Sequence, residues 1–283
     1  MVHSFSWFLE RLWGSPVSSK QVAVFRVVIC LLFFVIGPEE SQWVSSRWNP
    51  VGFWPEDSML SADTLHILHN ALRGCVGLAL VGFGGRAVLA LAGLGSAFFI
   101  SYSFNFEHNQ ILSALTFAML ALAVLPANDS WSVDRLLGFP IKERTDAELI
   151  WPFKLVQAYV MSIYAAAGFA KLQMSGWDWA FSENFPLILV SSESRSIIAD
   201  LLLDGPWELI QMGAALVVLL EVLSPFMILS SKLRIFFALE IVVFQVGVTL
   251  IMGRHYAFLS FPLIYLMSLP WSEWRRSHET KTV

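Results

Sequence analysis

Charged residues are scarce in this chain of 283 residues, where they make up 14% of the sequence against 56% apolar residues. An average soluble domain contains about 25% charged and about 45–50% apolar residues. A soluble globule of this size could not cover its surface with so few charges. The composition therefore excludes a disordered chain, a nucleic-acid-binding protein and a typical cytosolic enzyme. It predicts a polytopic protein embedded in a lipid bilayer.

Cysteine is almost absent as well, since Cys30 and Cys75 are the only two. Both lie in apolar runs, where a cysteine usually acts as a small hydrophobic residue. The chain therefore has no disulfide framework and no cysteine-rich metal site. His66 and His69 are suitably spaced for a metal, but no third ligand lies near them in the sequence, so we expect no metal. Glycine-rich phosphate-binding loops and the HExxH and GxSxG motifs are also missing.

What the chain does contain is a series of apolar segments, each close to the roughly 20 residues that a membrane-spanning helix needs. There are eight, at residues 21–37, 67–84, 86–103, 110–126, 151–172, 207–230, 234–252 and 255–270. The first, second and fifth are less typical because they contain or adjoin Arg26, Arg73 and Lys154. We expect Arg73 and Lys154 to extend to the nearest membrane surface. The predicted fold is an all-α polytopic membrane protein with about eight transmembrane helices in one domain, residues 1–283.

The basic residues predict that both termini face the cytoplasm, because cytoplasmic loops carry an excess of Lys and Arg. Eleven of them fall on the side of the termini and only three on the other side. The eleven are Arg11, Lys20, Arg86, Arg135, Lys142, Arg144, Lys232, Arg234, Arg275, Arg276 and Lys281, and the three are Arg47, Arg195 and Arg254.

Three segments outside the predicted spans are expected to lie at the membrane surface. Residues 1–20 place aromatic and leucine side chains on one face at helical spacing, which predicts an N-terminal interfacial helix rather than a signal peptide. Residues 38–66 and 173–206 form long extracytoplasmic loops rich in Trp, Phe and Pro. We expect these two loops to fold back as half-buried caps over the outer ends of the helices.

The fifth span carries a polar stripe that ends at a lysine. Its members recur at steps of three and four residues and so share one helix face: Lys154, Gln157, Met161, Tyr164, Gly168 and Lys171. The small residues around Gly168 allow a neighbouring helix to approach closely. Tight packing would desolvate Lys171 and favour its neutral amine, which is a base and a nucleophile. A lysine that merely extends to the outer interface is an equally good interpretation.

Other polar residues of the predicted spans and their ends are open to two interpretations. His108 lies in a polar cluster, residues 104–110, on the same predicted outer side as Lys171, but a single histidine more often serves only as a hydrogen-bonding group. Arg26 and Glu221 lie deeper in their spans, where charged groups are costly and usually paired. For these two residues a structural ion pair is at least as good an explanation as catalysis.

Two segments of the chain carry a recognisable pattern. The first is Phe106-Glu107-His108-Asn109-Gln110, followed by an apolar span and the turn Trp131-Ser132-Val133-Asp134. The second is Tyr164-Ala165-Ala166-Ala167-Gly168-Phe169-Ala170-Lys171-Leu172, with Trp177 after it. Together these segments resemble the vitamin K-dependent gamma-carboxylase family, a branch of the horizontally transferred transmembrane domain family. Weaker similarities at Arg26 and at Leu220-Glu221 extend the resemblance over about residues 20–270.

The resemblance implies a membrane enzyme that couples oxygenation of a reduced naphthoquinone, such as vitamin K or menaquinol, to carboxylation of a glutamate-type acceptor. Lys171 takes the place of the family's catalytic base and His108 that of its active-site histidine. Lys171 would deprotonate the quinol, O2 would add, the resulting alkoxide would abstract the carbon proton, and CO2 would trap the carbanion. Residues expected to contact quinone or substrate are Tyr164, Trp177, Glu107, Asn109, Arg26, Glu221 and Gln245.

The sequence also departs from the family's pattern. A later Phe-His pair of the family reads Phe244-Gln245 here, and Glu107 replaces an asparagine before the histidine. We expect the large extracytoplasmic domain of the animal enzymes to be absent, so the acceptor would be a peptide or small acid, presented with or without a partner protein. The compact form suggests a bacterial inner membrane, with the active site towards the extracytoplasmic side. Two alternatives remain open: a quinol-linked oxidoreductase without carboxylation, and a non-enzymatic maturation or export component.

Overall fold

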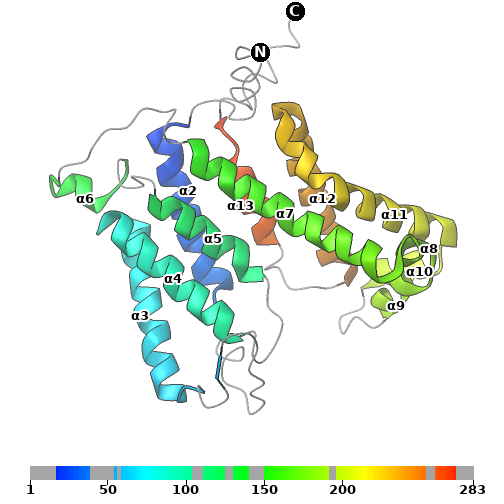
Figure 1. Cartoon of the computed structure of the whole chain (residues 1–283), viewed down its shortest axis with the longest axis horizontal. Coiled ribbons are helices and arrows are strands. Elements are labelled where there is room, and N and C mark those ends of the chain that lie inside the picture. The colour runs from blue at the N-terminus through cyan, green and yellow to red at the C-terminus, as the bar shows by residue number, and fades with distance from the viewer. Residues whose placement is uncertain are drawn as a thin grey trace, which may run out of the picture. The chain divides into compact units, whose positions relative to one another are not determined.

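The structure, a computed structural model, describes residues 17–38, 54–55, 59–103, 111–124, 130–139, 150–190, 196–252 and 259–271. Regular structure in these ranges is entirely helical, with no strand, so the all-α prediction is confirmed (Figure 1). The helices are α2 (Ser19–Ile36), α3 (Ala62–Val81), α4 (Gly85–Ser103), α5 (Ile111–Val124), α6 (Val133–Leu136), α7 (Ile150–Ser175), α8 (Asp178–Phe181), α9 (Asn184–Val190), α10 (Ile197–Leu203), α11 (Trp207–Leu223), the 3-10 helix η2 (Ser224–Leu229), α12 (Ser231–Met252) and α13 (Ser260–Ser268).

Six of these helices are long and apolar enough to cross a membrane: α2, α3, α4, α7, α11 together with η2, and α12. They match six of the eight predicted spans, including the three that contain Arg26, Arg73 and Lys154. The chain is therefore a membrane protein by the length and composition of its helices. In the other two predicted spans, α5 has 14 described residues and α13 has nine. The count of eight and the cytoplasmic position of both termini stay predictions.

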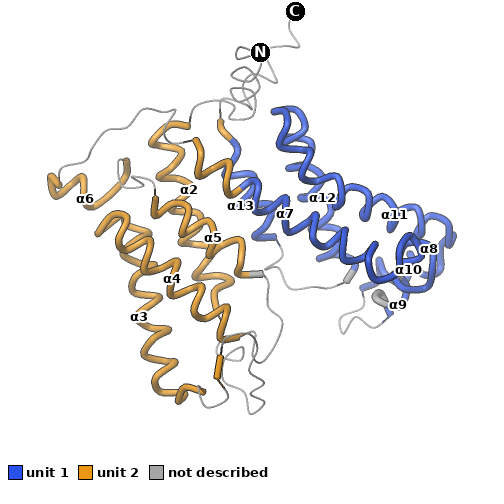
Figure 2. The backbone as a smooth tube through the Cα atoms, in the orientation of Figure 1, with its two compact units in different colours: residues 1–14, 157–269, 273–283 blue, residues 15–156, 270–272 orange. Residues whose placement is uncertain are grey.

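The described residues belong to two compact units, which are coloured separately in Figure 2. Unit 2 comprises residues 15–156 and 270–272, and unit 1 comprises residues 157–269 with the two chain ends. The predicted interfacial helix, residues 1–20, lies outside the described residues up to residue 16, as does most of the loop 38–66. The prediction of a single transmembrane domain stays a prediction.

Unit 2 is held together by close helix contacts with few polar groups. Ser96 on α4 and Thr116 on α5 share a buried hydrogen bond of 2.5 Å. Gly93 allows this approach, because a Cβ atom there would lie 2.6 Å from the side chain of Leu120. The rings of Phe25 on α2 and Phe153 in the first turn of α7 pack at a tilt of 39°, with their centroids 5.0 Å apart.

The polar stripe of the fifth span is the buried face of α7, as its spacing predicts. Gln157, Met161, Tyr164 and Gly168 are all buried, and Gln157 donates a hydrogen bond of 2.7 Å to the carbonyl oxygen of Ser268 on α13. Lys154, at the start of the stripe, is buried too, so the expectation that it extends to the membrane surface is wrong. Lys154 lies on the packed face of α7, and for this reason its side chain is buried. Arg73 is exposed near the middle of α3, with its guanidinium 5.7 Å from the centroid of the Phe34 ring, and its extension to the membrane surface stays a prediction.

The connection predicted as an outer loop, residues 173–206, contains the short helices α8, α9 and α10 in its described part. It is bonded to the two following spans. Gln211 of α11 donates to the carbonyl oxygen of Phe181 at 2.8 Å, and Ser196 donates to that of Ile251 on α12, also at 2.8 Å. This segment therefore packs against the beginning of α11 and the end of α12.

Candidate functional site

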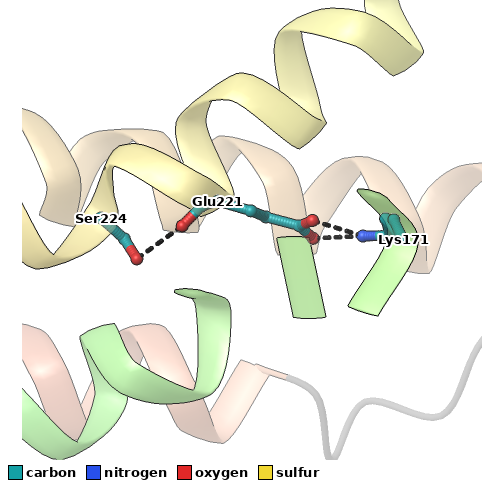
Figure 3. Close-up of polar contacts among 3 residues, drawn as sticks. All are labelled: Lys171, Glu221 and Ser224. Carbon is teal, nitrogen blue, oxygen red and sulfur yellow. Dashed lines mark hydrogen bonds and ion pairs between the residues drawn. The ribbon is translucent and has the colours of Figure 1, made fainter. Parts of the chain in front are cut away.

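The amine of Lys171 is bonded to the carboxylate of Glu221 in unit 1 (Figure 3). The Nζ atom lies 2.5 Å from both carboxylate oxygens, Oε1 and Oε2. The Glu221 side chain is 5% exposed and the Lys171 side chain is 22% exposed. The structure thus brings together two predicted site residues from α7 and α11, and it confirms that Glu221 has a charged partner.

Gly168 allows the two helices to come close enough for this pair. A Cβ atom at Gly168 would lie 2.8 Å from the Cβ of Glu221 and 2.9 Å from the backbone nitrogen of Val222. Only glycine fits against backbone at such a distance. The prediction that small residues allow close approach is confirmed at Gly168, whereas Ala166 and Ala170 are exposed on other faces of α7.

A second contact between α7 and α11 fixes the end of α11 just beyond the pair. The hydroxyl of Ser224 lies 2.7 Å from the carbonyl oxygen of Glu221 and 2.8 Å from that of Met161 on α7. Ser224 is fully buried and begins the 3-10 helix η2, which carries Pro225 in its first turn. Because this hydrogen bond ties the chain to α7 one turn beyond Glu221, the Glu221 carboxylate is held at a fixed position relative to α7.

The indole ring of Trp179 covers the lysine amine from α8. Its centroid lies 4.9 Å from Nζ of Lys171, within the range of a cation–π contact. Trp177, the tryptophan that the sequence pattern predicts at the site, is instead half-exposed at the N-cap of α8. Trp177 precedes α8 and Trp179 lies within it, so their spacing in the sequence could not show which ring faces the amine.

An apolar cavity of about 430 Å³ opens beside the amine. Its walls come from α7, α8, α10, α11 and α12, and among the described residues Lys171 is the one charged member of its lining. Gly213 and Gly247 line it as well, and a Cβ atom at either would have no neighbour within 4 Å, so both leave room for a ligand. The remaining lining residues are Trp179, Leu202, Leu209, Ile210, Ala214, Val217, Val243, Phe244, Val248 and Ile251. Such a cavity suits a largely apolar ligand with one polar group.

Tyr164 and Gln245, two further predicted site residues, lie behind the cavity rather than in its lining. They form a buried pair in which Nε2 of Gln245 donates to the Tyr164 hydroxyl at 2.7 Å. The Tyr164 ring also packs edge-on against Phe244, which does line the cavity. The pair therefore supports the cavity wall from α7 and α12.

Of the four remaining predicted site residues, the structure describes only Arg26. Arg26 is a fully buried residue of unit 2, where Nη2 donates to the carbonyl oxygen of Trp131 at 2.6 Å. His108, Glu107 and Asn109 lie outside the described residues, so their part in the site stays a prediction. In the described ranges, no group of three or more His, Cys, Asp or Glu side chains could hold a metal ion.

We compared the chain with models of known protein families, with curated proteins and with solved structures, and none of them matches it. A proposal for the function of the protein therefore rests on the geometry of unit 1 and on the resemblance of the two sequence segments described above.

Proposed function

We propose that this protein is a naphthoquinol-dependent, gamma-carboxylase-like membrane enzyme. One observation carries the proposal: the lysine that takes the place of the family's base has its amine at the wall of an apolar cavity among predicted membrane-spanning helices. A naphthoquinol matches this cavity in chemistry, because it combines flat apolar rings with hydroxyl groups that can meet a single amine. It also dissolves in the bilayer, from which it would enter.

In the proposed reaction the neutral form of the Lys171 amine, which is in equilibrium with the ammonium paired with Glu221, accepts a proton from a quinol hydroxyl. The ammonium formed is then held by the carboxylate of Glu221 and the ring of Trp179, both of which contact Nζ in the structure. The apolar lining excludes water from the reacting groups. Quinol, O2, CO2 and a glutamate side chain give the quinone epoxide, the carboxylated side chain and water, with release of one proton.

We further propose that His108 hydrogen-bonds an oxygen of the quinone and that the acceptor approaches from the extracytoplasmic side. Lys171 lies near the end of α7, next to the segment 173–206, which the distribution of basic residues assigns to that side. A bacterial inner membrane is the expected location. A glutamate-containing peptide or small acid is the expected acceptor.

The decisive experiment measures epoxide formation from reduced vitamin K and from menaquinol by the purified protein and by Lys171→Arg. Arginine keeps the positive charge beside Glu221, so the fold and the ion pair should be preserved, but it stays protonated and cannot act as a base. We expect wild-type protein to form the epoxide and Lys171→Arg to lose at least about 100-fold in rate.

Epoxidation by Lys171→Arg at the wild-type rate would refute the assignment of the base. If well-folded wild-type protein forms no epoxide from either quinol, the proposed enzymatic activity is refuted. A non-enzymatic membrane component is then the better explanation. Circular dichroism and thermal unfolding of both proteins serve as the control for folding.

A second candidate function is a quinol-linked oxidoreductase that does not carboxylate. It is favoured by the composition of the cavity, because in the part of the chain that the structure describes Lys171 is the one lining group able to bind an acidic acceptor, and the same amine is needed for the quinol. The two candidates differ in their products. Label from isotopic CO2 in a peptide or small acid indicates carboxylation, whereas quinol oxidation without incorporation of label indicates the oxidoreductase.

A further inference from the structure

The turn Trp131–Asp134, one of the segments that carry the family resemblance, lies in unit 2 and has no part in the reaction proposed above. Several hydrogen bonds hold it in place, among them one of 3.3 Å from the Asp134 N–H to the Gly82 carbonyl oxygen. Arg26 donates to the Trp131 carbonyl oxygen at 2.6 Å, Gly84 N–H donates to Oδ1 of Asp134 at 3.0 Å, and the Ser132 hydroxyl accepts from the backbone of Arg135 at 3.2 Å. The turn is thus a preformed element that joins α2, the α3–α4 connection and α6.

A cavity of about 660 Å³ lies beside this turn. It has two cationic side chains in its lining, Lys20 at the start of α2 and Arg135 on α6, and no acidic one among the described residues. The carboxylate of Asp134 is outside the lining and accepts the Gly84 hydrogen bond. Ser130 and Ser132 add hydroxyl groups to the wall. Guanidinium, ammonium and hydroxyl groups around one hollow are the donors that bind a phosphate group.

Large apolar side chains are exposed next to these cations. Trp131 is 64% exposed and Leu136 is 87% exposed, both in the cavity lining, and Leu137 and Phe139 follow at 61% and 54%. In a chain with membrane-spanning helices, such a mixture of exposed tryptophan, aliphatic and basic residues marks the depth of lipid headgroups. The cavity therefore has apolar groups for acyl chains beside cationic groups for a headgroup.

We propose that this cavity of unit 2 binds the phosphate headgroup of an anionic phospholipid from the surrounding membrane. Lys20 and Arg135 bind the phosphate, and Trp131 and Leu136 contact the upper acyl chains. Charge complementarity selects an anionic lipid over a zwitterionic one. The exposed apolar residues select a lipid over a soluble phosphate ester. The proposal is independent of the reaction at Lys171.

The test uses native mass spectrometry of the full-length protein with phosphatidylglycerol or phosphatidylcholine. A Lys20→Gln and Arg135→Gln double variant is compared with an Arg86→Gln and Lys232→Gln control, which also removes one arginine and one lysine. Both control residues are exposed and neither lines the cavity. We expect the wild type and the control to retain phosphatidylglycerol at least about tenfold more tightly than phosphatidylcholine, and the cavity variant to lose this preference.

A Lys20→Arg and Arg135→Lys variant, which preserves both charges, should retain the lipid. Equal retention of phosphatidylglycerol by the cavity variant and the control would overturn the proposal. Glycerol phosphate forms the second arm of the test, because it carries the same phosphate without acyl chains. If it binds as tightly as the lipid, the site takes a soluble phosphate ester and the lipid proposal fails.

Discussion

At the scale of single residues, the contact between Lys171 and Glu221 combines two groups that are costly to place inside a membrane protein. Each charge loses hydration on burial, and their mutual attraction offsets this loss only while both are present. Because Glu221 is the more deeply buried of the two, it depends more on its partner. The pair therefore contributes to the stability of the fold, whatever reaction takes place in the cavity.

This asymmetry predicts an order of stability among methionine variants of the pair. Lys171→Met leaves the buried carboxylate alone and should lower the free energy of unfolding by about 3–5 kcal/mol. Glu221→Met leaves a partly exposed amine and should cost less. The double variant should be more stable than Lys171→Met, because no unpaired charge remains. Thermal unfolding of the four proteins in one detergent measures the order, and a double variant less stable than Lys171→Met would contradict it.

The sequence predicted this site only in part, for reasons that individual residues make plain. Helical spacing placed Tyr164, Gly168 and Lys171 on one face of α7, and that face is buried except at Lys171. Spacing along one helix carries no information about its neighbours. Trp179 and the pairing of Glu221 with Lys171 therefore came only from the structure.

At the scale of helices, the crossing of α7 and α11 depends on Gly168. Gly168→Ala would place a Cβ 2.9 Å from the backbone nitrogen of Val222, so one helix has to shift. We expect a loss of about 1–3 kcal/mol in stability from this overpacking. Gly74→Ala on α3 is the matched control, since a Cβ atom there has no neighbour within 4 Å.

The control substitution should be neutral or slightly stabilising, because alanine favours a helix by up to about 1 kcal/mol over glycine. Melting temperatures of the two variants against wild type measure the difference. A Gly168→Ala protein as stable as Gly74→Ala would show that α7 and α11 do not cross in close contact.

Helix ends were harder to predict than helix positions, as the C-terminal end of α13 shows. The apolar segment 255–270 predicts a span that continues to residue 270, whereas α13 ends at Ser268 and Leu269 is already extended. Pro270 follows, and a residue directly before a proline is disfavoured in the helical conformation. Hydropathy alone counts the apolar residues beyond this end as part of the span.

At the scale of the whole molecule, the distribution of Lys and Arg makes an orientation prediction that labelling can test. Glu183 and Lys232 are exposed and lie before and after the span formed by α11 and η2. In a background with Cys30→Ala and Cys75→Ala, we expect Glu183→Cys to react with a membrane-impermeant thiol reagent from outside intact cells. Lys232→Cys should react only after the membrane is opened.

Labelling of Lys232→Cys but not Glu183→Cys in intact cells would reverse the orientation and move the Lys171 cavity to the cytoplasmic side. Labelling of both would mean that the segment between them does not cross the membrane.

Composition was sufficient to predict the class of this molecule, because a chain with 14% charged residues has few alternatives to a bilayer. The cavity could not be predicted in the same way. Its walls combine Leu202, Ile210 and Val243 with Lys171 from helices far apart in the sequence. Such residues look like ordinary core or lipid-facing positions until the helices are placed side by side.

The apolar lining of the Lys171 cavity has a practical consequence for biochemistry on this protein. A hollow of about 430 Å³ with one charged group is also a good receptor for the alkyl chain of a detergent. Linear detergents should therefore compete with the quinol, raising its apparent KM as micelle concentration rises. Bulky steroid-like detergents and lipid nanodiscs should not compete in this way. The measured activity of the purified protein should therefore depend on the solubilising agent.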